Sequence, residues 1–256
     1  ATVKPATVKP ATVKPATVQQ AVSQPTKKAC LVGINYTDGD FVLSNCINVV
    51  FRLRYLLINS YGFNNENVEV ITNKNATKSD ILHKFTELIK NASEGDDIFF
   101  SFSANGVSVK EGNDNEVMVS ADFKAIMNDE VQSILKQHMK KGVKLCIFLD
   151  NCYNEVILDL QYNYTGIRMI PFIENKPYKE LEGDIVCLSG CQDKPNTYNG
   201  AMTWAFAETL SCDKNVDWSD AFRNINKTLK SKKFEQTVKL SVNDLPFDEN
   251  GSVFKC

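Results

Sequence analysis

Histidine is scarce in this sequence: its 256 residues include only two, His83 and His138. Chemistry that uses an imidazole as a base or a metal ligand therefore has few residues to draw on. No two cysteines have C-x-x-C spacing, and no cysteine and histidine group has the spacing of a zinc site. No apolar run approaches the ~18 residues that a membrane-spanning helix needs. The sequence thus predicts neither a structural zinc site nor a membrane span.

Positive charge is not in excess either. The chain has 29 Lys and Arg residues against 31 Asp and Glu residues, a formal net charge of −2. Proteins that bind nucleic acids usually present a basic domain or stripe to the phosphates. We therefore expect no nucleic-acid partner.

The eight cysteines do not suggest the disulfide framework of a small secreted domain. Cys146 and Cys187 lie inside apolar runs, where a free thiol packs as a small hydrophobic side chain. We expect a reducing, cytoplasmic location. Secretion is the alternative, because N-x-[ST] sequons begin at Asn35, Asn75, Asn91, Asn163, Asn226 and Asn250.

The N-terminal segment is a pentapeptide array. Residues 1–20 contain Ala-Thr-Val-Lys-Pro three times, followed by Ala-Thr-Val-Gln-Gln. A proline every fifth residue blocks regular helix and removes backbone donors from a strand. We expect residues 1–25 to form a flexible tail and residues 26–256 to form a single domain. The alternative is a binding arm that presents regularly spaced lysines.

After the tail, segments typical of strands alternate with segments typical of helices. We expect strands at 29–34, 67–72, 97–103, 143–150 and 184–189, and helices at 43–60, 77–91, 129–140, 201–210 and 218–229. This alternation indicates βαβ units, and hence an α/β fold with a mainly parallel sheet and helices on both faces.

The most informative stretch is Val143–Cys152, an apolar run that ends in Asp150 and is followed two residues later by Cys152. Ligands of open α/β sheets bind just beyond the carboxyl ends of such strands, so Cys152 stands where a nucleophile is expected. A thiol nucleophile also needs a base within hydrogen-bond reach. Both histidines fall within expected helices, and we expect neither to lie near Cys152.

Seven segments carry further motifs, at residues 28–36 (KACLVGINY), 43–48 (LSNCIN), 96–106 (DDIFFSFSANG), 148–152 (FLDNC), 189–193 (SGCQD), 200–206 (GAMTWAF) and 234–241 (FEQTVKLS). In this order they resemble the metacaspases, which are caspase-like cysteine peptidases. The resemblance implies a caspase-like three-layer sandwich. It also implies a His/Cys dyad at the tips of two adjacent strands.

Cys152 matches the nucleophile of that dyad, but Asn105 stands at the position of the histidine. An amide neither accepts the thiol proton nor lowers the thiol pKa. Loss of general acid–base help typically costs about 10²–10⁴-fold in rate. The segment 153–155 (YNE) also departs from the family's H-S-G turn, which helps to shape the oxyanion site.

The resemblance places an acidic substrate pocket, which accepts Arg or Lys before the scissile bond, at Cys46, Val49, Ser103 and Asp150. Val49 replaces an aspartate of the family, so Asp150 is the remaining acid and basic recognition should be weaker. Many metacaspases use calcium, whose matching positions here are Asn115, Asn128, Asp129 and Asp159. Two acids of that set are amides, so we expect no required cofactor and at most weak calcium binding.

The resulting hypothesis is a catalytically inactive metacaspase homologue with a binding or regulatory role. Expected partners are proteins or peptides, including a competent metacaspase or its substrates, and the resemblance favours a monomer. One alternative is an active endopeptidase that uses Cys152 with low or altered activity. Another is a tether, in which the repeat tail is the functional part.

Overall fold

Eight strands form one central sheet in the order β2-β1-β3-β7-β10-β11-β8-β9. The computed structural model describes residues 24–36, 42–104, 106–109, 115–150, 158, 160–167, 169–171, 181–192, 200–234 and 236–254. The parallel strands are β1 (Lys27–Gly33), β2 (Val68–Thr72), β3 (Asp97–Ser103), β7 (Lys144–Asp150) and β10 (Asp184–Gln192). The strands β11 (Gln236–Val242), β8 (Tyr162–Tyr164) and β9 (Met169–Pro171) continue the sheet in antiparallel pairs.

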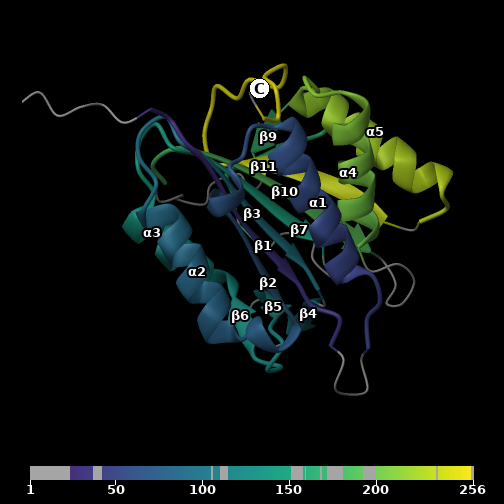
Figure 1. Ribbon diagram of the computed structural model, residues 1–256. Helices are drawn as coiled ribbons and strands as arrows, with labels where there is room; N and C mark the ends of the chain where they lie inside the picture. The colour runs from purple at the N-terminus through teal and green to yellow at the C-terminus, as the bar shows by residue number, and fades with distance from the viewer. Residues whose placement is uncertain are drawn as a thin grey trace, which may run out of the picture.

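Helices cover both faces of this sheet (Figure 1). The helices α1 (Cys46–Ser60), α4 (Ala201–Cys212) and α5 (Trp218–Ser231) pack on one face. On the other face lie α2 (Lys78–Lys90) and α3 (Asn128–His138). A small antiparallel sheet of β4 (Gly106–Val109), β5 (Asn115–Val119) and β6 (Ala125–Met127) precedes α3, and two short 3-10 helices occupy Asn65–Asn67 and Asn73–Asn75.

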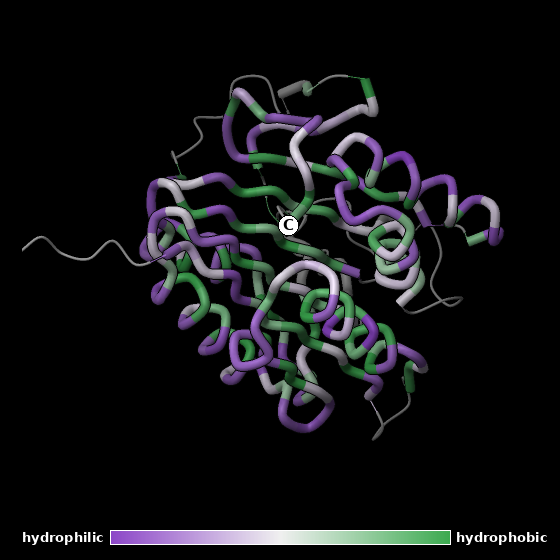
Figure 2. The backbone as a smooth tube through the Cα atoms, turned by 45° about the horizontal axis from the view of Figure 1, so that its top comes forward, coloured by the Kyte–Doolittle hydropathy of each residue, from purple (hydrophilic) through white to green (hydrophobic). Residues whose placement is uncertain are grey.

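The central strands are apolar because each contributes side chains to two cores. Phe99 and Phe148 face α1 and α4, whereas their neighbours Phe100 and Ile147 face α2 and α3. Figure 2 shows hydrophobic colour along the strands and alternating colours along the helices. A sheet covered in this way needs near-continuous apolar runs, as the sequence has.

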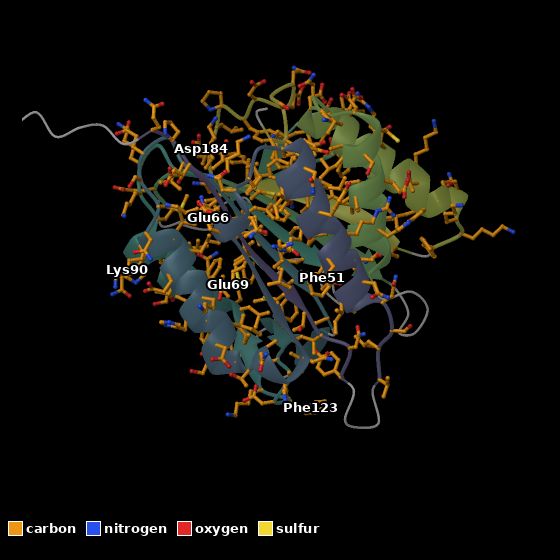
Figure 3. The ribbon with its side chains drawn as sticks, in the orientation of Figure 1. Phe51, Glu66, Glu69, Lys90, Phe123 and Asp184 are labelled. Carbon is orange, nitrogen blue, oxygen red and sulfur yellow. The ribbon has the colours of Figure 1, made fainter. Side chains whose placement is uncertain are left out.

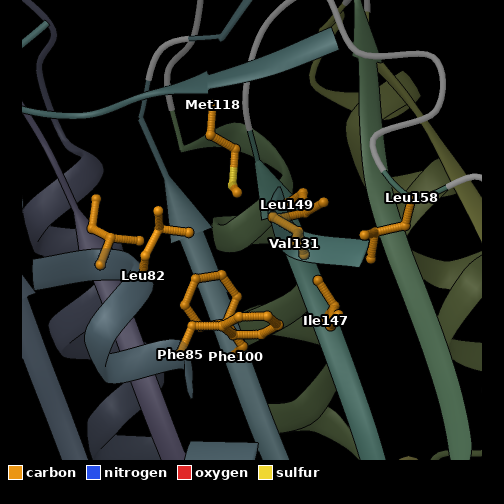
Figure 4. Close-up of a pocket in the computed structure, with 9 residues that line it drawn as sticks. Leu82, Phe85, Phe100, Met118, Val131, Ile147, Leu149 and Leu158 are labelled. Atoms are coloured by element: carbon orange, nitrogen blue, oxygen red, sulfur yellow. The ribbon is translucent and has the colours of Figure 1, made fainter. Parts of the chain in front are cut away.

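The core beneath α2 and α3 is closely packed. Its small pocket (Figure 4) has a volume of about 10 Å³ and is lined by apolar side chains that include Phe85, Phe100 and Met118. That is room for about one water molecule, and a site without polar partners does not hold a water well. We therefore assign no ligand to this pocket.

The expected α/β sandwich is confirmed, and each expected strand and helix is observed with ends within three residues of the expectation. Strands β4, β5, β6, β8, β9 and β11 were not expected. The first five are three to five residues long, too short for a clear period in the sequence. Among the described residues, no helix is long and apolar enough to span a membrane.

The cysteines inside the sheet are buried free thiols. Cys146 lies in β7 and Cys187 in β10, and both are almost fully covered. Burial raises the pKa of the Cys187 thiol to about 12, and it raises the pKa of Cys146 as well. The expectation that these two cysteines pack as hydrophobic side chains is confirmed.

A buried carboxylate, Asp96, fixes the start of β1 against the turn before β3. Its Oδ1 accepts hydrogen bonds from the backbone N–H (2.7 Å) and the hydroxyl (2.9 Å) of Thr26. Its Oδ2 accepts from the Ser93 N–H and the Lys28 ammonium, both at 3.0 Å. Burial by itself raises the pKa of a carboxyl, but these donors outweigh it and hold the pKa of Asp96 below its ordinary value.

Replacing Asp96 by Asn is expected to lower the free energy of unfolding by about 2 kcal/mol near neutral pH, because an ionised acceptor with several donors is lost. Because the pKa of Asp96 is lower in the folded state, its ionised carboxylate stabilises the fold at pH values above the unfolded-state pKa of about 3.9. This stabilisation is lost as the pH falls toward the folded-state pKa. The difference in the free energy of unfolding between the wild type and Asp96→Asn should therefore become smaller at acid pH.

Urea denaturation of both proteins near neutral pH and in the acid range measures this difference. Asp129→Asn is the matched control, since Asp129 is exposed and its substitution should change little at either pH. A deficit in Asp96→Asn that does not change with pH would contradict the assignment.

Candidate functional site

The site predicted from the sequence lies at the carboxyl ends of β3 and β7, which are neighbours in the middle of the sheet. Ser103 and Asp150, the last residues of these strands, face each other in the parallel register. Both dyad positions, Asn105 and Cys152, lie outside the described residues. The structure therefore describes the strand ends that lead to the dyad and the pocket residues beside them.

Asp150 is 3% exposed and makes hydrogen bonds inside the protein. Its Oδ2 accepts from the backbone N–H and the hydroxyl of Thr203, each at 2.7 Å. Its Oδ1 accepts from the Gln236 amide at 3.2 Å. Burial raises the pKa of Asp150, and the donors from Thr203, Gln236 and the backbone of Met202 only partly oppose that rise.

These contacts place Asp150 at the N-terminus of α4. The residue before the helix, Gly200, has φ 82° and makes no side-chain cap. A Cβ atom on Gly200 would lie 3.0 Å from a methyl group of Val49, and the positive φ is strained for any residue that has a side chain. Asp150 supplies the missing acceptor to the first turn of α4, where a helix also favours negative charge.

The four residues matched to the substrate pocket come together at the carboxyl ends of the central strands. Cys46 and Val49 lie in the first turn of α1, and Ser103 pairs with Gly33 of β1. A Cβ atom on Gly33 would lie 3.0 Å from the carbonyl oxygen of Cys46, which shows how closely α1 approaches β1. Cys46, Val49 and Ser103 are each at most 3% exposed.

Two polar atoms near Asp150 have no hydrogen-bond partner within the described part of the chain. They are the Ser103 hydroxyl oxygen and the Gln236 Oε1 oxygen, both buried. Buried polar atoms usually have a hydrogen-bond partner, because burying one without a partner lowers the stability of the fold. The two atoms beside these strand ends therefore make the site locally less stable. Functional sites are where such costs are most often found.

Thr203 and Gln236 are hydrogen-bond partners of Asp150 that the sequence argument did not assign to the site. Both belong to segments that resemble the metacaspases, but nothing in their spacing showed that they bind Asp150. The structure also shows a role for Gly190. A Cβ atom there would come within 2.3 Å of the Gln236 amide nitrogen, so a side chain at this position would push Gln236 away from Asp150.

The positions matched to calcium are only partly described. Asp159 and the side chain of Asn115 lie outside the described residues. Asn128 is buried and Asp129 is exposed at the start of α3, and the pairing of β5 with β6 brings the backbone of Asn115 to the same end of that hairpin. Within the described set, Asp129 is the one carboxylate among these positions.

Neither histidine lies at the carboxyl ends of the strands. His83 is exposed in the middle of α2. His138 is the last residue of α3, from which the chain returns to the amino end of β7. The expectation that both lie in helices is confirmed.

The aromatic residues of the segment 200–206 divide between core and surface. Phe206 is fully buried and stacks on Phe148, with 4.6 Å between ring centroids. Trp204 is half-buried, packs against Phe234 and lies under the ammonium group of Lys232. Of these two rings, only that of Trp204 is therefore partly exposed.

Solved structures show the same fold at low sequence identity. Protein GSU0716 from Geobacter sulfurreducens superposes with a TM-score of 0.65 at 18% identity, over 89% of this chain and 97% of that one. The Drosophila initiator caspase Dronc superposes with a TM-score of 0.53 at 10% identity, over 90% of this chain and 85% of that one. Both support a caspase-like fold.

Sequence comparisons are more specific. Metacaspase-1 of Plasmodium falciparum is 32% identical over 216 residues, which is 74% of this chain and 35% of that protein. Metacaspase-1B of Aspergillus oryzae is 24% identical over 291 residues, covering 88% of this chain and 69% of that protein. The profile described as metacaspase, peptidase C14 domain, matches residues 27–161. That match covers more than half of the sequence, and the chain belongs to the metacaspase family.

Proposed function

We propose that this metacaspase-family chain is a pseudopeptidase, which keeps the peptidase scaffold for binding or regulation without efficient hydrolysis of peptide bonds. The observation that carries the proposal is the environment of Asp150. The last acid of the substrate pocket is buried and its oxygens already accept hydrogen bonds from Thr203 and Gln236.

The composition of the dyad supports this proposal. Cys152 stands at the nucleophile position and Asn105 at the position of the base. A thiol without an assisting base has a pKa near 8.5 and is only a few per cent thiolate at neutral pH. The residues of a catalytic unit act together, so removing one of them costs about as much rate as removing all of them. Without the base, the retained cysteine therefore contributes little to catalysis.

The substrate pocket supports the proposal independently. A guanidinium binds best through paired, charge-assisted hydrogen bonds to carboxylates. Val49 offers an apolar side chain where the family has an acid, and the carboxylate of Asp150 is engaged at α4. A basic substrate would have to displace the donors of Thr203 and Gln236, which would leave the first turn of α4 uncapped.

The scaffold is then available for a protein or peptide partner, such as a catalytically competent metacaspase or the substrates of one. We propose that it acts as a monomer in a reducing compartment and requires no cofactor. Any calcium binding involving Asp129 would be weak, because calcium affinity falls with the number of carboxylate ligands.

The second candidate function is a cysteine endopeptidase of low or altered activity. The observation that favours it is the retention of Cys152 directly after a central strand of the sheet. This candidate requires a base other than His83 or His138. It also requires basic residues to be recognised without the usual pair of acids.

The two candidates differ in a peptidase assay. We expect the full chain to release no more product from a peptide with Arg or Lys before the scissile bond than its Cys152→Ala variant does, with or without added calcium. The reason is the missing general base, whose loss costs about 10²–10⁴-fold. Turnover that depends on Cys152 would overturn the pseudopeptidase proposal.

The Asn105→His variant tests the cause of the inactivity. We expect it to gain Cys152-dependent turnover, because an imidazole can accept the thiol proton. If it gains none, the turn at residues 153–155 has also lost its role at the oxyanion site. The double variant Asn105→His with Cys152→Ala is the control for contaminating peptidases.

Asp150→Asn tests whether this acid is a structural cap. Because the pKa of Asp150 is raised in the folded state, the folded protein holds the proton more tightly than the unfolded chain does. The wild type therefore loses stability as the pH rises from the unfolded-state pKa of about 3.9 through the folded-state pKa. Asn stays neutral, and its amide can donate to the unpaired Oε1 of a rotated Gln236. The variant should therefore fold and gain stability relative to the wild type as the pH rises.

Urea denaturation across the acid to neutral range measures this trend. Asp150→Ala is the matched control, since it removes the acceptor altogether and should destabilise the protein at every pH, by about 1–3 kcal/mol. A wild type that remains more stable than Asp150→Asn by the same margin at all pH values would show that Asp150 ionises normally.

A further inference from the structure

A cavity of about 350 Å³ lies at the opposite end of the sheet from the candidate site. It is open to solvent and lined by the amino ends of β3, β7 and β10, by Trp218 and by the C-terminal segment 242–254, and we name it the amino-end cavity. Its volume falls within the ~300–1,000 Å³ of small-ligand sites. Strands β3 and β7 each have seven residues, so about 20 Å separates it from Ser103 and Asp150.

One wall of the amino-end cavity is a row of charges. Asp97, Lys144 and Asp184 are the first residues of their strands and are adjacent in the parallel register. Among the described residues, none of these three side chains has a hydrogen bond or an ion pair. Figure 3 shows Asp184 at the end of the molecule where β1 begins.

The lining as a whole is acidic. Asp244 and Asp248 add to Asp97 and Asp184, so four carboxylates line the cavity with one ammonium group, that of Lys144. This excess of negative charge beside a low-dielectric wall attracts a cation.

The remaining wall is apolar and aromatic. Trp218, Phe247 and Phe254 line it, and the rings of Trp218 and Phe247 lie 6.3 Å apart. Such a wall suits the methylene stem of an amphipathic cation, whose charged end then reaches the carboxylates. Aromatic faces add further attraction for a cation.

The cavity is held open by contacts that do not involve a ligand. Asn243 accepts the Ile185 N–H at 2.8 Å and donates to the Gly183 carbonyl at 3.0 Å. The N–H groups of Trp218 and Ser219 donate to carbonyls of the segment 249–251, which ties that segment to α5. A preformed site binds at a lower entropic cost than one that must be ordered.

We propose that the amino-end cavity binds a primary ammonium group on an aliphatic stem, the chemistry of a lysine side chain. The site lies apart from the residues matched to the peptidase, so the proposal stands whether or not the chain hydrolyses peptides.

The chain itself contains one source of this chemistry. Each Ala-Thr-Val-Lys-Pro repeat contributes one lysine, at Lys4, Lys9 and Lys14, and no acidic residue precedes Asp38. The chain joins the sheet at Thr26, whose carbonyl accepts the Asp97 N–H at 3.0 Å.

The reach of the chain is sufficient for this source. Lys14 lies twelve residues before Thr26, which allows a span of at most about 40 Å. Tethering gives such a lysine an effective concentration in the millimolar range. The second source is a lysine of another protein or peptide.

Calorimetric titration with the peptide ATVKPATVKPATVKP tests the proposal. The receptor is the full chain carrying Lys4→Gln, Lys9→Gln and Lys14→Gln, so that its own tail does not compete. We expect saturable binding that weakens with added salt. It should weaken at least tenfold when Asp97→Asn and Asp184→Asn are added to the receptor.

Two controls keep the test specific. A peptide with Gln in place of each Lys should not bind. The pair Asp129→Asn and Asp213→Asn removes two exposed acids elsewhere and should leave the affinity unchanged. The proposal is overturned if no receptor binds the lysine peptide, if the Gln peptide binds equally well, or if both pairs of substitutions have the same effect.

The same titration on the wild-type chain separates the two sources. An affinity several-fold weaker than that of the Gln-substituted receptor means that the chain's own lysines occupy the cavity. Equal affinities mean that the lysine comes from another molecule. Either result supports the ammonium site, provided that binding depends on Asp97 and Asp184.

Discussion

Burial of the parallel sheet on both faces is the constraint on which the rest of this structure depends. With α2 and α3 on one side and α1, α4 and α5 on the other, the strand interiors are filled mainly by apolar side chains, with small polar ones such as Ser101 and Ser189 among them. The charged side chains of β1, β3, β7 and β10 lie at the strand ends. The described part of this sheet therefore offers charged groups at both ends of β3 and β7, and both ends carry aspartates.

Two buried aspartates show how the same residue type serves opposite roles at these ends. Asp96, near the amino ends, has the ammonium group of Lys28 among its donors, and its pKa is lowered. Asp150, at a carboxyl end, has only neutral donors, and burial raises its pKa. Both residues have little exposed surface, but Asp150 lies deeper among protein atoms and has no charged partner, whereas Asp96 has one. One acid stabilises the fold as an anion, whereas the other is most compatible with it when protonated.

The sequence was sufficient to predict the layers of this fold, because apolar runs and helical periods are local signals. Strand 97–103 was predicted to the residue, and Asp150 was expected at the end of its strand. The partners of Asp150 were not predictable in the same way. Thr203 and Gln236 lie 53 and 86 residues away along the chain, and only tertiary packing brings them to the carboxylate.

The amino-end cavity was unpredictable for the same reason. Its lining extends from Asp97 to Phe254 and combines residues that lie far apart in the sequence. Register decides which of them meet. Asp97, Lys144 and Asp184 become neighbours only because their strands pair in parallel from their first residues. A sequence pattern gives the strands but not this alignment.

The role that we propose for Asp150 gives the residue at this position a task in the fold that does not depend on substrate recognition. A residue that only bound substrate would be free to change in a homologue without peptidase activity. A residue whose side-chain oxygen caps α4 is constrained by the fold as well, because Gly200 offers no capping side chain and its φ of 82° disfavours a residue that could. A carboxylate at the expected position in a metacaspase homologue is therefore weak support for basic specificity. The partners of that carboxylate decide whether it is available to a substrate.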